Sequence, residues 1–264
     1  ELEAIETGAV IATVNQIGGK LYVKIDGTNS SKATSLLKIL ELAAKEKPEQ
    51  SRADTTTEID YIYGSPELSV FDHFGSTLIG IIVFFFVFLI SGISFLGERT
   101  SGTLEKLLST PIKRWEIVVG YAVGFGALTI VQSALITFFV VYVLDVAMVG
   151  SLWLVLLITL LSALAALTLG TLISSAAASE FQMIQFIPII IVPQIFFSGL
   201  FDLSPGWSAV GKAMPLYYVA DALNKVMIKG DGLSAIALDI VVLVGFSTMC
   251  MVGNTLLLKK YRRV

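Results

Sequence analysis

The residues that could support catalysis or bind a metal are few and widely separated in this sequence. There is one histidine, His73, and one cysteine, Cys250, which lies in an apolar run and permits no intrachain disulfide. Asp239 lies near the start of the same apolar run and is the one charged residue in it. Hydrolysis inside a membrane requires a Ser–His pair, an Asp pair or a set of metal ligands. We therefore expect no catalytic site and no metal site, and an intramembrane enzyme is the least favoured function.

A short segment imitates a nucleotide-binding loop. Residues 206–212, GWSAVGK, match the first seven positions of the phosphate-binding pattern G-x-x-x-x-G-K. The eighth position is Ala213, which lacks the hydroxyl that would hold Mg²⁺, and no strand is expected before the segment. We therefore expect no ATPase activity in this chain. The net charge of −3 also gives no indication of a nucleic-acid partner.

The composition predicts a membrane protein. Hydrophobic residues make up 55% of the 264 residues and charged residues only 15%, whereas a soluble domain is about 25% charged. A helix that crosses the hydrocarbon core needs about 20 mostly apolar residues. Five segments meet this requirement, and they are 74–96, 117–144, 152–173, 181–201 and 235–258. We predict an all-α helical membrane bundle over residues 73–264, with five visible transmembrane helices.

The distribution of Lys and Arg predicts the orientation, because short cytoplasmic loops carry an excess of these residues. Eight lie on one side of the predicted membrane: Arg99, Lys106, Lys113, Arg114, Lys259, Lys260, Arg262 and Arg263. Three lie on the other side: Lys212, Lys225 and Lys229. We expect the C-terminus in the cytoplasm and residues 1–72 outside the plasma membrane. Because a polar domain needs an export segment, we also expect one more helix before Glu1, which would make six spans.

The two polar regions outside the spans are expected to be structured. Residues 1–72 are predicted to form a small extracytoplasmic α/β domain that is incomplete at its start. It would have strands at 9–14 and 20–26, a helix at 31–45 and a loop at 49–57. The outer loop 202–232 contains Trp and Tyr, which favour the membrane–water boundary. We expect this loop to form short helices at the outer membrane surface.

The predicted cytoplasmic segment 97–116, GERTSGTLEKLLSTPIKRWE, has the pattern of a stiff amphipathic hairpin. Thr103 is expected to cap a short helix with Glu105 in its first turn. Three leucines would share one face of this helix: Leu104, Leu107 and Leu108. Pro111 is expected to begin the next helix. The pattern alone allows two interpretations, an interfacial helix resting on lipid headgroups or a docking surface for a cytoplasmic partner.

The run from Glu98 to Pro111, ERTSGTLEKLLSTP, resembles the E-R-x-x-G-T-x-E-x-L-L-x-T-P signature of the type-2 ATP-binding-cassette exporter permeases. In these ABC-2 type transmembrane subunits this stretch forms the coupling helix. The resemblance extends to the YGSP approach at 63–66, the proline-bearing fifth span, the SGLF exit at 198–201 and the MPL at 214–216. It departs at the start, since the first helix of the family is not in this sequence.

The resemblance implies an ATP-driven exporter in which this chain is the non-catalytic permease half. Two permease subunits, identical or different, would sit in membrane lipid on two cytoplasmic ABC ATPase subunits, which would bind the ATP and Mg. The permease itself would carry no cofactor. The resemblance places these residues at the ATPase contact: Glu98, Arg99, Gly102, Thr103, Leu104, Glu105, Leu108 and Pro111. The alternative is a membrane receptor or scaffold that uses the outer domain to bind an envelope component, which leaves the hairpin motif unexplained.

Polar residues inside the predicted spans have two interpretations. Small and hydroxyl-bearing residues let transmembrane helices pack closely, whereas polar residues that face a cavity mark transport pathways. The candidates for a substrate path are Thr129, Gln132, Ser133, Thr137, Gln185 and Gln194. For the hydroxyls, and for the G-x-x-x-G step of Gly120 and Gly124, helix packing is the favoured interpretation. Pro188 and Pro193 are expected to kink or break their span.

Overall fold

The computed structural model describes residues 12–17, 20–26, 38–39, 57–63, 70–201, 203 and 205–258. The chain divides into two compact units, Glu1–Phe74 and Gly75–Val264. The change of composition in the sequence placed the boundary between residues 72 and 73.

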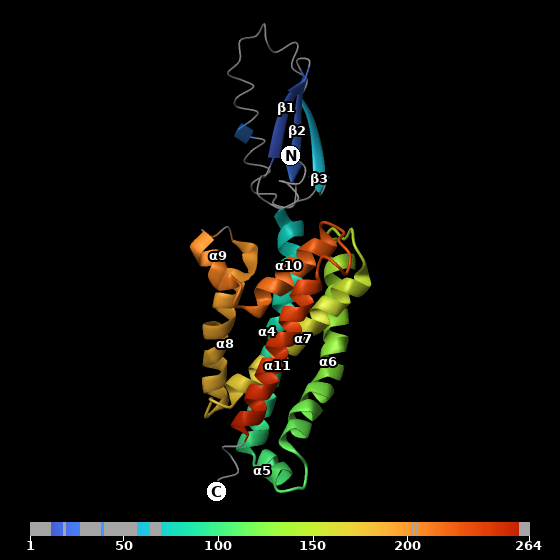
Figure 1. Ribbon diagram of the computed structural model, residues 1–264. Helices are drawn as coiled ribbons and strands as arrows, with labels where there is room; N and C mark the ends of the chain where they lie inside the picture. The colour runs from blue at the N-terminus through green and yellow to red at the C-terminus, as the bar shows by residue number, and fades with distance from the viewer. Residues whose placement is uncertain are drawn as a thin grey trace. The chain divides into compact units, whose positions relative to one another are not determined.

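The first unit contains a three-stranded sheet in the order β1-β2-β3 (Figure 1). Strand β1 (Ala12–Ile17) pairs antiparallel with β2 (Lys20–Asp26), which pairs parallel with β3 (Thr57–Tyr63). Val23 in the middle of β2 is fully buried. The predicted bounds of β2 are confirmed, whereas β1 ends at Ile17 rather than at residue 14.

Strand β3 was missed because the polar run before it suggested a loop. Its sequence TEIDYIY alternates polar and apolar residues, with Ile59 and Tyr61 two positions apart, and this is the period of a strand. The predicted loop 49–57 was therefore too long at its end, since Thr57 already belongs to β3. The predicted helix 31–45 lies outside the described residues apart from Lys38 and Ile39, which are helical. An α/β domain remains a prediction.

The second unit is a bundle of helices, five of which are long and apolar enough to cross a membrane. The main helices are α4 (Val70–Thr100), α6 (Arg114–Tyr142), α7 (Leu152–Ser174), α8 (Glu180–Ile195, extended by a π-helical turn, η1, over Phe196–Leu200) and α11 (Ala237–Leu257). Each coincides with one predicted span. The prediction of an all-α membrane bundle with five visible spans is therefore confirmed for the part of the chain that the structure describes.

Helix α7 packs closely against α4 because small residues line the contact. A Cβ atom added at Gly170 would lie 2.7 Å from the carbonyl oxygen of Phe88 and would also clash with Ser91 Oγ. Ala163, Ala165 and Ala166 on α7 are fully buried. Small side chains let two helix backbones approach closely, and this gain in packing replaces the hydrophobic driving force that is weak in lipid.

The G-x-x-x-G step on α6 has no packing partner among the described residues. A Cβ added at Gly120, Gly124 or Gly126 would meet no atom within 4 Å. Packing of Gly120 and Gly124 against a helix outside the described residues therefore remains a prediction. Small residues that do bring helices together include Gly80 and Gly92 on α4 and Gly170 on α7, where an added Cβ would clash.

The prolines of α8 have a smaller effect than expected. The helix continues through both Pro188 and Pro193 to Ile195, and the irregular geometry comes only afterwards, in η1. Gly199 at the end of η1 has a φ of 93°, a left-handed conformation that favours glycine. Non-helical backbone at membrane depth is tolerated where protein surrounds it, and α10 packs on η1.

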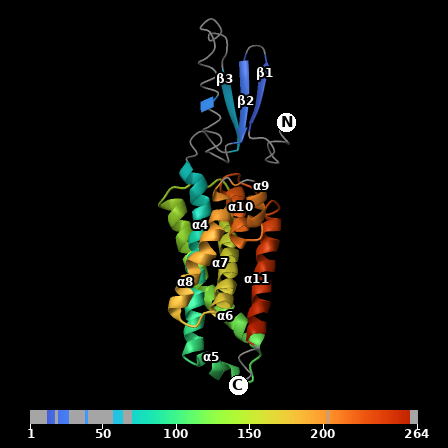
Figure 2. The same cartoon turned by 90° about the vertical axis from the view of Figure 1, so that its left-hand side faces the viewer.

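Two short helices follow η1: α9 (Pro205–Gly211) and α10 (Pro215–Met227). Both lie at one end of the helical unit, whereas the hairpin helix α5 (Thr103–Leu108) lies at the opposite end (Figure 1, Figure 2). The apolar face of α10 is buried against α4, α7 and α11, with Val219, Leu223 and Val226 fully covered. The short helices were predicted, but α10 is part of the bundle core rather than a surface element.

We expect Gly170→Leu to destabilise the bundle by about 1–3 kcal/mol, because the new side chain overpacks the α4–α7 contact. Gly124→Leu is the matched control, since its side chain would enter open space. Thermal unfolding of the two detergent-solubilised variants measures the difference. An equal Tm for both variants would show that α4 and α7 do not approach at Gly170.

Candidate functional site

The hairpin helix α5 begins at a glycine that the backbone geometry requires. Gly102 occupies the N-cap position with a φ of 77°, and an L side chain would be strained in this conformation. Thr103 is the first helical residue and does not cap the helix, contrary to the prediction; its hydroxyl lies 3.0 Å from Ser101 Oγ. Gly102 therefore allows the sharp turn between α4 and α5.

The apolar face of α5 is fixed to the bundle. Leu104 is 1% exposed and lies in a cluster with the ends of α4, α6 and α11, formed by Phe95, Ile117, Val118 and Leu258. Leu107 and Leu108 pack partly buried against the same cluster. Because these leucines are covered by the protein itself, they are not the face with which an interfacial helix would rest on lipid. This arrangement favours the docking interpretation.

The opposite face of the hairpin is exposed and mostly polar, with Pro111 and Ile112 as its apolar members. It consists of Thr103, Glu105, Lys106, Ser109, Thr110, Pro111, Ile112 and Lys113. Three of the predicted ATPase-contact residues, Thr103, Glu105 and Pro111, lie on this exposed face. Glu98, Arg99, Gly102 and Leu108 are half-buried, and Leu104 is buried. The motif therefore combines residues that could meet a partner with residues that hold the hairpin in place.

Helix α6 starts later than the sequence suggested. Pro111 lies in the turn, and α6 begins at Arg114 with Lys113 as its N-cap. The backbone N–H of Lys113 donates to Glu116 Oε2 at 2.9 Å, which satisfies one of the donors that every helix start leaves free. The prediction that Pro111 begins the second helix was wrong. The capping interaction between Lys113 and Glu116 sets the start of α6 at Arg114, three residues after Pro111.

Arg99 points from the end of α4 to the C-terminus of α7. Its guanidinium donates to the carbonyl oxygens of Ser174 at 3.0 Å and Ser175 at 2.7 Å, and also to that of Ala177. The last carbonyls of a helix have no partner within the helix, and a cation there also interacts favourably with the helix dipole. Helix α7 has no basic residue in its own last turn. Arg99 therefore ties the base of the hairpin to the α7–α8 turn.

At the other end of the bundle, polar contacts hold α10 between α4 and α11. Ser76 donates to Asn224 Oδ1 at 2.6 Å, and Asn224 Nδ2 donates to Thr77 at 3.3 Å. Lys225 Nζ lies 2.9 Å from Asp239 Oδ2 and 2.7 Å from Asp221 Oδ2. Asp239 is 1% exposed. The carboxylate that stood alone in the sequence is thus paired across 14 positions of the chain.

The two carboxylates keep Lys225 charged. Partial burial alone would lower the pKa of its ammonium, but the hydrogen bonds to Asp221 and Asp239 outweigh burial and raise the pKa above its usual value. A raised pKa stabilises the folded state at pH values below the unfolded pKa, and this stabilisation is lost as the pH rises through the folded pKa. Lys225 therefore keeps its charge, and its contribution to the α10–α11 contact, throughout the physiological pH range.

The structure separates the predicted substrate-path residues into three environments. Thr129 and Gln132 line a cavity between α4, α6 and α7. Ser133 and Thr137 lie on the buried face of α6, which packs against α7 and α11. Gln185 is exposed on α8, whereas Gln194 is buried. The six residues do not line one continuous path among the described residues.

Sequence reasoning missed the partners of Arg99, Asn224 and Lys225. A signal was available for Lys225. A carboxylate in an apolar span requires a cation, and Lys225 and Lys229 are the two basic residues nearest to Asp239 on that side of the described bundle. The partners of Arg99 are backbone carbonyls, which no residue type in the sequence announces.

We expect Lys225→Met to destabilise the protein by about 3–5 kcal/mol, because it leaves Asp239 buried without its cation. The double variant Lys225→Met/Asp239→Leu should recover much of this loss, since two apolar groups can replace a buried ion pair. Lys212→Met is the control, because Lys212 is exposed. Chemical or thermal unfolding in detergent measures all three. A double variant no more stable than Lys225→Met would contradict the pairing.

Comparisons with known proteins agree with this architecture. Residues 42–228 match the family model described as ABC-2 type transporter. The chain is 26% identical over 197 residues to the ABC transporter G family member 20 of Dictyostelium discoideum, covering 73% of this chain and 27% of that protein. It is 25% identical over 187 residues to the "Probable multidrug ABC transporter permease YbhR" of Escherichia coli (strain K12), covering 68% and 50%.

The chain thus spans half or less of the length of these curated relatives. The family match nevertheless covers more than half of this chain, and it includes the hairpin, four of the five candidate spans, and α10 up to residue 228. Together with the multi-pass bundle, this match shows that the chain belongs to the ABC-2 type transporter family and is a permease, a membrane component of an ABC transporter.

Proposed function

We propose that this chain is the permease subunit of an ATP-driven exporter, and that a separate cytoplasmic ATPase docks on the exposed face of the α5 hairpin. The observation that carries the proposal is the division of the hairpin into two faces. Leu104 fixes one face to the bundle, while Thr103, Glu105 and Pro111 remain exposed on the other. An element whose leucine face is already attached to the bundle, and whose free side is mostly polar, suits a docking partner better than lipid.

In this proposal the hairpin transmits movement of the ATPase to several helices at once. The leucine face packs against the ends of α4, α6 and α11. Arg99 of α4 adds α7 through its hydrogen bonds to carbonyls at the end of that helix and in the turn after it. A displacement of α5 would therefore act on α4, α6 and α11 through direct contacts, and on α7 through Arg99.

The ATP and Mg belong to the partner in this proposal, and the permease supplies no catalytic group. A second permease subunit, identical or different, would complete the transporter. The excess of Lys and Arg at the α5 end supports a cytoplasmic position for this end and for the C-terminus. Residues 1–72 and the α9–α10 end would then lie outside the cell. The relative in Escherichia coli is named a multidrug permease, which makes efflux of apolar compounds the first activity to test.

We expect Glu105→Lys to abolish or strongly weaken co-purification of the ATPase, because it reverses an exposed charge on the proposed docking face while leaving Leu104 in place. Lys212→Glu, a charge reversal at the opposite end of the bundle, is the matched control. Both variants should be expressed and folded to the same extent, as judged by thermal unfolding. If the ATPase still associated undiminished with the Glu105→Lys variant and with a Pro111→Glu variant, the docking proposal would be refuted.

We expect Arg99→Lys to lower transport more than it lowers ATPase association. A lysine ammonium donates all its hydrogen bonds from one nitrogen, whereas the planar guanidinium of Arg99 donates to several carbonyl oxygens at once. Reconstituted complexes would report both ATP hydrolysis and ATP-dependent efflux of a fluorescent apolar dye. An expected several-fold drop in dye moved per ATP would identify Arg99 as a coupling residue. An unchanged ratio would show that its contacts only stabilise the fold.

A further inference from the structure

A groove of roughly 290 Å³ lies between the start of α6 and the last turns of α11. Trp115, Val118 and Val119 line it on α6, and residues between Thr248 and Leu256 line it on α11. The eight residue steps from Thr248 to Leu256 span about 12 Å of helix, and one leaflet of the hydrocarbon core is about 15 Å thick. The α6–α11 groove can therefore follow most of one leaflet, starting at the end of the bundle that carries α5 (Figure 1, Figure 2).

The wall of the α6–α11 groove is apolar. Its two hydroxyl groups are satisfied within α11, because Thr248 donates to the carbonyl oxygen of Val244 at 2.7 Å and Thr255 donates to that of Met251 at 2.9 Å. The other lining residues are aliphatic or aromatic. An acyl chain would gain dispersion contacts along such a wall and would leave no polar group of the wall without its partner.

Two basic residues border the groove at the start of α6. Lys113 is the N-cap of α6 and Arg114 is its first residue, directly before Trp115. Neither forms an ion pair with a residue that the structure describes. Trp115 is 53% exposed, and tryptophan favours the membrane–water boundary. The two cations that precede it therefore lie at the level of the lipid phosphates.

The end of α11 brings further positive charge to the same place. Leu258, the C-cap of α11, is buried in a cluster with Ile117 and Val118 of α6. The residues that follow Leu258 in the sequence include four basic residues and no acidic residue: Lys259, Lys260, Arg262 and Arg263. Clusters of this kind next to the cytoplasmic end of a transmembrane helix are typical of proteins that bind anionic lipids.

The acidic residue in the first turn of α6 does not reverse this balance. Glu116 is not among the residues that line the groove. Its carboxylate accepts the backbone N–H of Lys113 at 2.9 Å and so caps the helix. It offsets one charge, whereas Lys113, Arg114 and the four basic residues after Leu258 carry six. The headgroup end of the groove is therefore suited to an anion.

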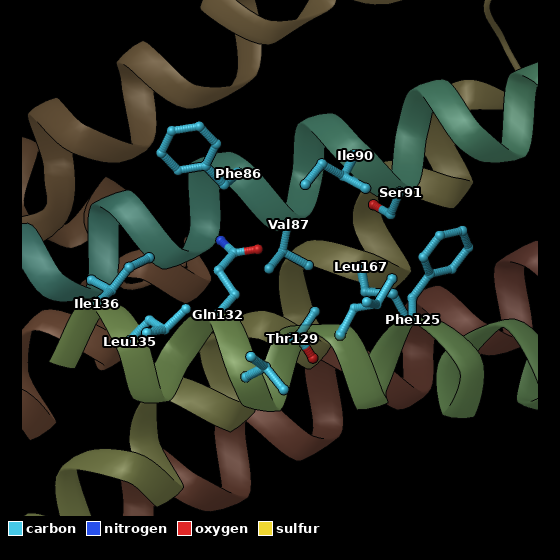
Figure 3. A pocket seen from close by; sticks show the side chains of 12 residues that line it. Phe86, Val87, Ile90, Ser91, Phe125, Thr129, Gln132, Leu135, Ile136 and Leu167 are labelled. Atoms are coloured by element: carbon cyan, nitrogen blue, oxygen red, sulfur yellow. The ribbon is translucent and has the colours of Figure 1, made fainter. Parts of the chain in front are cut away.

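The larger cavity between α4, α6 and α7, of roughly 550 Å³, lacks this combination (Figure 3). Its lining includes no charged residue, and the hydroxyls of Ser91 and Thr129 are bonded within their own helices. Nothing in that lining distinguishes one apolar occupant from another. The α6–α11 groove differs because its apolar wall accepts a chain while the charges at one end select a headgroup.

We propose that the α6–α11 groove binds an anionic phospholipid of the cytoplasmic leaflet, with one acyl chain along the wall and the phosphate at Lys113 and Arg114. Phosphate oxygens accept strong hydrogen bonds from both ammonium and guanidinium groups. The inference goes beyond the proposed export function and takes from it only the cytoplasmic position of the α5 end. The bound lipid joins α6 to α11, and the ends of these two helices help to hold Leu104 of α5.

Quenching of Trp115 fluorescence by brominated lipids tests this proposal. The sample is the full chain in phosphatidylcholine vesicles, with Trp153→Phe and Trp207→Phe so that Trp115 is its one tryptophan. The probes are phosphatidylglycerol and phosphatidylcholine, each brominated at the same position of one acyl chain. We expect brominated phosphatidylglycerol to reach half-maximal quenching at a roughly five- to tenfold lower mole fraction than brominated phosphatidylcholine.

Three variants of this chain separate the headgroup contact from the chain contact. Lys113→Gln/Arg114→Gln should remove the preference for phosphatidylglycerol, because it removes the charges that select the phosphate. Lys212→Gln, which removes an exposed charge at the opposite end of the bundle, is the matched control and should keep the preference. Val252→Phe, which fills the groove, should lower the quenching by both lipids. Thermal unfolding checks that all three are folded.

Several results would overturn the proposal. Equal quenching by the two lipids would show that the groove selects no anionic headgroup. A preference that survives Lys113→Gln/Arg114→Gln would show only a general attraction of basic segments to an anionic bilayer. Unchanged quenching of Val252→Phe would show that no acyl chain enters the groove. Quenching by neither lipid would show that another protein surface, such as a second copy of the chain, covers Trp115.

Co-purification of the ATPase with the same variants separates this inference from the proposed function. A preference that depends on Lys113 and Arg114, without association of an ATPase, would refute the exporter proposal and leave the lipid site standing. Association that depends on Glu105, with equal quenching by the two lipids, would refute the lipid site alone. Loss of the preference when the ATPase is added would assign Lys113 and Arg114 to the docking face and would also refute the lipid site.

Discussion

In apolar surroundings a buried polar group is most stable when it finds a partner within the protein, and helix α7 supplies such partners to both α4 and α11. Asn254 of α11 donates to the Thr168 carbonyl at 3.0 Å and to the Thr171 hydroxyl at 2.9 Å, both on α7. Arg99 of α4 donates to carbonyls at the end of the same helix. Gly170 lets α4 approach α7 closely enough for the two backbones to pack. The positions of α4 and α11 therefore depend on α7.

This arrangement connects the two ends of the bundle. The hairpin helix α5 rests on α4, α6 and α11 through Leu104. At the opposite end α10 is bonded to α4 through Asn224 and to α11 through Lys225. Helices α4 and α11 thus contact both α5 and α10 directly. A displacement of the hairpin would move them as units, because their centres are fixed to α7, and the effect would be felt at α10.

The sequence predicted the parts of the fold that depend on long local patterns. Five apolar runs correctly located five helices, since the cost of placing charge in a span is large enough to keep these windows free of it. The start of α6 and the cap of α5 were wrong because each depends on one backbone angle or one capping contact, at Gly102 and Glu116. Contacts between distant segments, such as Arg99 with the α7–α8 turn, depend on tertiary packing, which local patterns do not encode. For the candidate site, the pattern identified the hairpin and its leucine face but not the helix ends on which this face packs.

The distribution of regular and irregular backbone indicates where the bundle can change shape. Helices α4 and α7 are continuous and fixed to each other by close packing, so they are poor candidates for bending. The chain after α8 differs, because Gly199 within η1 has a left-handed conformation and α10 follows after only a short helix. Hydrogen bonds and one ion-pair cluster hold α10, and its apolar face is also buried against α4, α7 and α11. A change of shape is therefore easier in the irregular segment between α8 and α10 than at α10 itself, and it would leave the central helices intact.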